Sequence, residues 1–189
     1  MKYVEIIFCF TPHVILRMFV VGNEGLLIIL KYINMNKVIL ERSFSTPIEK
    51  VWEALTVADT LKKWWCPPGM ESPHISVDLK KDGIFGYCFS APDGKEFWGR
   101  GVYQIIEQPK FLSFLDTFTD SDGNPVAPSY YGMPEEKIVE SLVEFSLTME
   151  NGITTMKMVG DNPHDDSLRE DMEKGWNGMF DKLEVLLKG

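Results

Sequence analysis

The most regular hydrophobic pattern of the chain lies near its C-terminus, in residues 165–188. Apolar side chains recur there at steps of three and four residues, the spacing of one helix face, at Leu168, Met172, Trp176, Met179, Leu183 and Leu186. Charged residues cover much of the remaining surface. The pattern predicts a long amphipathic helix, and such a helix needs a broad apolar surface on which to pack.

Between residues 74 and 160 the pattern changes to the alternation of apolar and polar residues that is typical of strands. Turn signals divide this region, among them Pro92-Asp93-Gly94 and Asn151-Gly152, which favour hairpins. The apolar faces of the strands between these turns would supply the surface that the C-terminal helix needs. We therefore expect strands at 74–79, 84–90, 97–107, 111–119, 138–149 and 153–160.

Upstream of the predicted sheet, residues 38–44 suit a further strand, and residues 47–56 and 58–65 have helical spacing. Pro47 suits the first turn of a helix, and we expect Thr46 before it to act as the N-cap. Sequential hairpins with helices segregated to the ends form α+β domains. We therefore predict an α+β fold, with a curved antiparallel sheet of about six or seven strands wrapped on the C-terminal helix.

Residues 1–34 differ from the rest of the chain. They are strongly apolar, but two acidic residues, an arginine and a proline interrupt them, so no run approaches the roughly 20 residues that a membrane helix needs. Three interpretations of this N-terminal extension stay open: an upstream stretch that is not translated in the cell, a membrane-surface or targeting segment, or an added strand or helix. We expect a single domain over residues 35–189, beginning at Met35.

Composition narrows the classes of function. A formal net charge of −9 argues against a nucleic-acid surface, which is normally basic. The three cysteines, Cys9, Cys66 and Cys88, are too few and too scattered for a disulfide framework or a thiolate metal site. The three histidines also lack metal-ligand spacing. We therefore expect a cytoplasmic protein without a metal, a cofactor or a membrane span.

Several motifs together resemble one known family. They are FSTPIEKVWEALT at 44–56, the Trp64-Trp65 pair followed by CPPG, APDG at 91–94, GVYQIIEQPKFL at 101–112, DGNPVAPSYYGMP at 122–134 and GWNGMFDKLE at 175–184. In this order they are similar to homologues of the C-terminal domain of the heat-shock-protein-90 ATPase activator, within the SRPBCC superfamily of START-like, pollen-allergen-like and polyketide-cyclase-like domains. The resemblance covers residues 35–189. It implies the helix-grip fold, in which a curved antiparallel sheet surrounds a C-terminal helix and an internal cavity.

The chain's many aromatic residues are the expected walls of this cavity. Apolar walls with a few polar groups are typical of small-molecule sites, but aromatic rings also fill solid cores. Gly175 and Gly178 flank Trp176 in the predicted helix, where each glycine costs roughly 1 kcal/mol relative to alanine, and this favours a groove beside the ring. The predicted wall residues are Trp64, Trp65, Phe85, Tyr87, Phe89, Phe97, Tyr103, Phe114, Phe118, Tyr131, Trp176 and Phe180.

Asp116 is the one charged side chain that we place with these rings, because it alternates with Phe114 and Phe118. A buried Asp116 would have a raised pKa and could act as an acid or a base. The alternatives are that Asp116 lies in solvent or pairs with Arg100. The glycines beside Arg100 permit a bulge, so the pattern does not fix which side of the sheet it faces.

Two further features have alternative interpretations. Cys66 is either a reactive thiol near two lysines in sequence or a small apolar side chain. The long loop 120–137 is either a lid over the cavity, with Tyr130 and Tyr131 offering hydroxyls to a ligand, or a surface loop packed on its own side chains.

These expectations give a ranked set of functions. The first is a small intracellular module that binds an apolar or amphipathic small molecule in the sheet–helix cavity without chemistry. The second is a cyclase- or dehydratase-type enzyme, for which Asp116 is the only acid–base group that the sequence offers. The third is a co-chaperone or stress-response partner that binds a chaperone. We assign no catalytic residue and expect a monomer or a homodimer.

Overall fold

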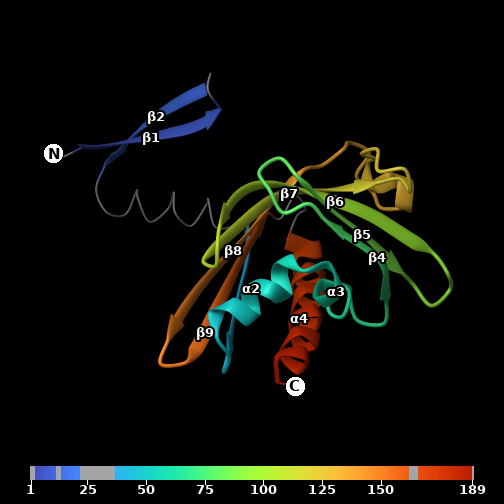
Figure 1. Cartoon of the computed structure of the whole chain (residues 1–189). Helices are drawn as coiled ribbons and strands as arrows, with labels where there is room; N and C mark the ends of the chain where they lie inside the picture. The colour runs from blue at the N-terminus through green and yellow to red at the C-terminus, as the bar shows by residue number, and fades with distance from the viewer. Residues whose placement is uncertain (1–2, 12–13, 22–36, 162–165, 189) are drawn as a thin grey trace. The chain divides into compact units, whose positions relative to one another are not determined.

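A seven-stranded antiparallel sheet curls around the C-terminal helix in the computed structural model (Figure 1). The order across the sheet is β3-β9-β8-β7-β6-β5-β4, so β3 and β4 are its edges. The long helix α4, Asp166–Lys188, packs against one face of the sheet. The predicted α+β helix-grip fold is confirmed. The strands are β3 Lys37–Phe44, β4 Glu71–Val77, β5 Ile84–Ser90, β6 Glu96–Glu107, β7 Phe111–Thr119, β8 Ser141–Glu150 and β9 Ile153–Asp161.

The structure describes residues 3–11, 14–21, 37–161 and 166–188. The chain divides into two compact units, Met1–Lys37 and Val38–Gly189. In the first unit, β1 (Tyr3–Thr11) and β2 (Val14–Val21) pair as an antiparallel hairpin. The predicted domain start at Met35 lies outside the described residues. Among the helices described, none has both the length and the hydropathy to cross a membrane.

Two short helices follow β3, as predicted, but their ends differ from the expected ones. The helix α2 spans Ile48–Thr56 with Pro47 as its N-cap and no side-chain cap, so the expectation for Thr46 is wrong. The Thr46 carbonyl instead accepts a hydrogen bond from the Thr154 hydroxyl at 2.7 Å, which ties this segment to β9. The helix α3 is only Ala58–Leu61, because the chain continues through tight turns instead of extending the helix to residue 65.

Two strands begin three residues away from the predicted start. The edge strand β4 begins at Glu71 rather than 74, with a register shift before His74 that accommodates Pro73. The strand β8 begins at Ser141 rather than 138. The Val139 carbonyl just before it accepts a hydrogen bond from the hydroxyl of Thr117 at 2.7 Å, so a side chain takes the place of a strand partner there.

The apolar face of α4 packs on the sheet as its spacing predicts. Met179, Phe180 and Leu183 are buried, while Met172 and Trp176 are partly buried against the same core. Each fully buried side chain of this size contributes about 1.5–3 kcal/mol to stability. The side chain of Leu168, the first residue of the predicted face, lies outside the described residues. Among the described side chains of the helix, burial is greatest in the C-terminal half.

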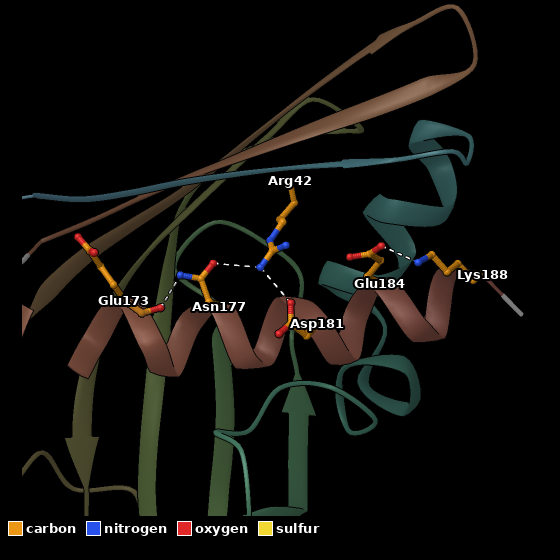
Figure 2. A network of polar contacts seen from close by, with 6 residues as sticks. All are labelled: Arg42, Glu173, Asn177, Asp181, Glu184 and Lys188. Carbon is orange, nitrogen blue, oxygen red and sulfur yellow. Dashed lines mark hydrogen bonds and ion pairs between the residues drawn. The ribbon is translucent and has the colours of Figure 1, made fainter. Parts of the chain in front are cut away.

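A polar network ties β3 to α4 (Figure 2). The Arg42 guanidinium on β3 donates to Asn177 Oδ1 at 3.1 Å and pairs with Asp181 Oδ1 at 2.9 Å. The Asn177 amide in turn donates to the carbonyl of Glu173 at 2.8 Å. Because the Asp181 side chain is 67 % exposed, the ion pair adds little stability, and its main effect is to orient the helix on the edge strand.

Gly178 and Gly175 give a matched test of how closely α4 is packed. A Cβ at Gly178 would overlap the ring of Pro68, whereas a Cβ at Gly175 would meet no atom within 4 Å. We expect Gly178→Ala to lower the free energy of unfolding by about 1–3 kcal/mol through overpacking. Gly175→Ala should raise it by up to about 1 kcal/mol, because alanine favours a helix. Urea unfolding followed by circular dichroism measures both, and equal effects of the two substitutions would contradict this packing.

Candidate functional site

A cavity of about 270 Å³ lies between the inner face of the sheet and α4. Six aromatic rings line it, together with two methionines, a valine, a glycine and one carboxylate. A mostly apolar wall with few polar groups is the usual form of a small-molecule site. The residues of the predicted set that line the cavity are Trp65, Tyr87, Phe89, Phe114, Asp116, Phe118 and Trp176.

A second cavity of about 280 Å³ adjoins the first. The loop 120–137 contributes Pro128 and Met133 to its wall, and the C-terminal end of β9 contributes Asp161. The loop therefore borders the cavity, as the lid interpretation requires. The two cavities share the lining residues Asp116, Phe118, Val143, Met172 and Trp176.

Trp65 lies at the centre of the aromatic wall. Its ring makes edge-on contacts with Phe85 on β5 and Trp176 on α4, at centroid distances of 5.1 and 5.4 Å. Phe114 and Phe145 on the sheet lie 6.1 and 6.2 Å away. Because Trp65 comes from the turns after α3, this segment inserts a large ring between the sheet and the helix and sets their separation.

Asp116 on β7 is the only charged side chain among the described residues that line the first cavity. The Tyr87 hydroxyl on β5 donates a hydrogen bond to this carboxylate and lies 3.1 Å from both of its oxygens. Burial raises the pKa of Asp116 to about 7, and the hydrogen bond from Tyr87 opposes the rise. Burial and the Asp116 charge also raise the pKa of Tyr87 well above its usual value, so Tyr87 stays a donor.

Asp116 and Arg100 face opposite sides of the sheet. The β6–β7 pairing sets Gly101 opposite Asp116, so Arg100, the neighbour of Gly101, points to the other face. The register shift in β6 lies beyond Tyr103 and does not change this side. The Arg100 guanidinium donates to the carbonyl of Gly123 at 3.2 Å. The alternative in which Asp116 pairs with Arg100 is therefore wrong, and the Asp116 side chain is partly buried.

The other six predicted wall residues lie outside the wall of the first cavity. Phe97 and Tyr131 pack on each other at a centroid distance of 5.2 Å. The remaining four belong to the solid core, which was the alternative interpretation for these rings. They are at most 2 % exposed: Trp64, Phe85, Tyr103 and Phe180.

The Tyr131 hydroxyl was expected to face the cavity, but it makes hydrogen bonds within the protein instead. It donates to the carbonyl of Thr119 at 2.6 Å and accepts from the backbone N–H of Trp98 at 3.0 Å. These bonds hold the short 3₁₀ helix η1, Pro128–Tyr131, against the end of the sheet. Tyr130 beside it is 63 % exposed. The loop is thus anchored by its own side chains and also borders the second cavity.

Glycines give the cavity its shape. A Cβ at Gly99 would overlap the ring of Tyr87, and a Cβ at Gly101 would overlap the ring of Phe114, so β6 has room for both rings only without side chains there. Gly175 on α4 lines the cavity and has open space beside it, which fits the predicted groove next to Trp176.

Cys66 and His74 lie outside the cavity. The buried Cys66 thiol donates to the carbonyl of Met70 at 3.2 Å, and Lys182 Nζ on α4 lies 3.0 Å from the sulfur. The His74 ring packs on Trp98 at 5.5 Å on the outer face of the sheet. Within the described part of the chain, no group of three or more histidine, cysteine or acidic side chains has the arrangement of a metal site.

Comparison with known proteins decides the family. A family model described as "Activator of Hsp90 ATPase homolog 1-like protein" (AHSA1) matches residues 45–188, well over half of the chain. The chain belongs to the AHSA1 family. The resemblance inferred from the motifs is confirmed. No curated protein matches the AHSA1-family chain significantly.

Solved structures share the fold of this AHSA1-family domain. A protein from Arthrobacter aurescens is 20% identical with a TM-score of 0.70, and the match covers 82% of this chain and 88% of that one. The AHSA1 protein from Silicibacter pomeroyi is 21% identical with a TM-score of 0.66, covering 80% and 97%. A protein from Staphylococcus epidermidis is 26% identical with a TM-score of 0.66, covering 81% and 90%.

The first cavity is also lined by three side chains that lie outside the predicted wall. They are Val143, Met172 and Met179. The two methionines lie on the same predicted helix face as Trp176, four residues before it and three after it, so the helical spacing alone could have indicated them. Val143 lies in register with Phe114 across β7 and β8, and this neighbour is visible only once the strand pairing is known.

The raised pKa of Asp116 predicts a pH dependence of stability. Because the folded protein holds this proton more tightly than the unfolded chain, the stabilisation is full below the ordinary pKa of 3.8 and is lost as the pH rises through about 7. The free energy of unfolding should fall by up to about 1.4 kcal/mol per pH unit in this window.

Asp116→Asn should lack this loss and should be more stable than the wild type above neutral pH. Urea unfolding at a series of pH values measures the difference. Glu107→Gln, at an exposed position of the same domain, is the control for the change in net charge. A variant profile that parallels the wild-type profile across the window would contradict the raised pKa.

Proposed function

We propose that this AHSA1-family domain binds an apolar or amphipathic small molecule between the sheet and α4. The observation that carries the proposal is the aromatic cavity, of about 270 Å³, that adjoins a second of about 280 Å³. Small-molecule pockets commonly have about 300–1,000 Å³ and apolar walls with a few polar groups. The shared wall of the two cavities leaves room for a ligand that extends from one into the other.

The partial exposure of two wall side chains supports the proposal. Phe89 and Trp176 are only partly buried, although both pack against the core and line the cavity. A ligand that covers them would remove apolar surface from water, at about 25 cal/mol per Å². The rings that hold the wall open, above all Trp65, are themselves fully packed, so the cavity is formed before a ligand arrives.

Filling the cavity from α4 should abolish binding without unfolding the domain. Gly175 lines the cavity with open space at its Cβ, so Gly175→Leu places a side chain where the ligand would lie. Lys174→Leu introduces the same side chain at the neighbouring position, which is 71% exposed, and should leave binding intact.

Native mass spectrometry of the full chain, purified gently from its native cells, is the measurement. We expect a mass excess that disappears on denaturation, that persists in Lys174→Leu and that is absent from Gly175→Leu. A bare polypeptide mass for all three proteins, or an equal excess in both variants, would count against ligand binding in this cavity.

The Asp116 carboxyl in the cavity wall supports a second candidate function, a cyclase- or dehydratase-type enzyme. A pKa of about 7 leaves both forms of Asp116 populated near neutral pH, as a general acid or base needs, and Tyr87 orients the group toward the cavity. This candidate predicts turnover of a bound ligand with a rate that changes through about pH 7. Unchanged turnover in Asp116→Asn would exclude this role for Asp116.

A further inference from the structure

We propose that the ligand of this cavity is an organic cation, a quaternary ammonium or a protonated amine on an apolar body, with the Asp116 carboxylate as its counter-ion. The inference rests on the proposed function and adds the chemical class of the ligand. Two independent features of the cavity carry it, the partners of the carboxylate and the kind of surface around it.

The first feature is that the described residues offer Asp116 no cationic partner. Its hydrogen bond comes from the neutral hydroxyl of Tyr87. The nearest basic residue on the neighbouring strand β6, Arg100, points to the other face. An ionised carboxylate removed from water is costly unless it is paired. A cationic ligand supplies the missing charge, which a neutral ligand cannot do.

The second feature is the aromatic surface around the carboxylate. The rings of Trp65 and Trp176 meet at 82° with centroids 5.4 Å apart, which forms a corner between the sheet and α4. Tyr87 and Phe89 stack at 4.8 Å and continue the wall along β5. The faces of aromatic rings attract cations, tryptophan most strongly, and more so when the site excludes water. An apolar cation therefore fits both the walls and the charge.

The groups that face Asp116 define the pH window of binding. On β5 this is Tyr87, whose raised pKa keeps it neutral. On β9, Asp161 borders the second cavity, which Asp116 also lines, and accepts the N–H of Leu142 at 2.9 Å. The described lining residues of α4 and of the loop 120–137 carry no charge. The affinity for a cation that does not titrate should therefore rise as the pH passes about 7 and level off above it.

The test compares two probes of the same shape that differ in charge. Benzyltrimethylammonium is the cation, and neopentylbenzene is its neutral isostere, with carbon in place of nitrogen. Titration of the full chain, followed by tryptophan fluorescence at pH 8, should show the cation binding at least about tenfold more tightly than the neutral probe. Asp116→Asn should remove this preference, and Glu107→Gln, at an exposed site, should retain it.

The outcomes separate this inference from the proposed function. Equal binding of the two probes, or a cation preference that persists in Asp116→Asn, would overturn the inference and leave a cavity that binds neutral molecules. Binding of neither probe at millimolar concentration would also overturn it. The mass-spectrometry comparison of Gly175→Leu then decides the proposed function by itself.

If Asp116→Asn does not fold, the wild-type affinity for the cation at pH 5 and pH 8 is the decisive measurement, because a flat profile overturns the inference.

Discussion

The separation between the sheet and α4 depends on one inserted side chain, that of Trp65. Its ring contacts six other aromatic rings, from the sheet, the helix and its own neighbour Trp64. The segment that carries it is fixed on both sides. The Trp64 indole donates to the carbonyl of Ala54, and Lys182 donates to the carbonyls of Cys66 and Pro67. Toward the C-terminal end of α4 the gap is filled by Phe180 and Leu183, and toward the other end it remains a cavity.

This arrangement explains why a carboxylate is tolerated on the inner face of the sheet. Asp116 lies where the filled core ends, close enough to the rings to lose most of its hydration and close enough to Tyr87 to keep one hydrogen bond. One neutral donor compensates only part of the cost of burying the charge. Local groups that lower the stability of the fold are common at functional sites.

The sequence predicted the bounds and faces of elements best where a single hydrophobic periodicity runs from one turn signal to the next. The bounds of β5 and β7 agree with the pattern at both ends, and the face of α4 agrees from Met172 onward. The pattern could not separate wall from core, because Trp64 and Trp65 are adjacent and only the turns after α3 decide which of the two rings lines the cavity. It could not place Arg100 either, since this depends on where the bulge of β6 lies. The chaperone partner, the oligomeric state and the compartment stay predictions, because they depend on surfaces and surroundings that periodicity does not encode.

Gly99 connects the backbone of β6 to the chemistry of the cavity. The Tyr87 ring occupies the space of its missing side chain, and the Tyr87 hydroxyl holds Asp116. A larger residue at position 99 would displace the ring and release the carboxyl, although Tyr87 and Asp116 themselves stay unchanged. In the evolution of such a domain, the chemistry of the cavity can therefore change through a strand position that lines neither of the two cavities. Related sequences should then lose the glycine, the tyrosine and the acid as a set, and a comparison restricted to contact residues would miss the cause.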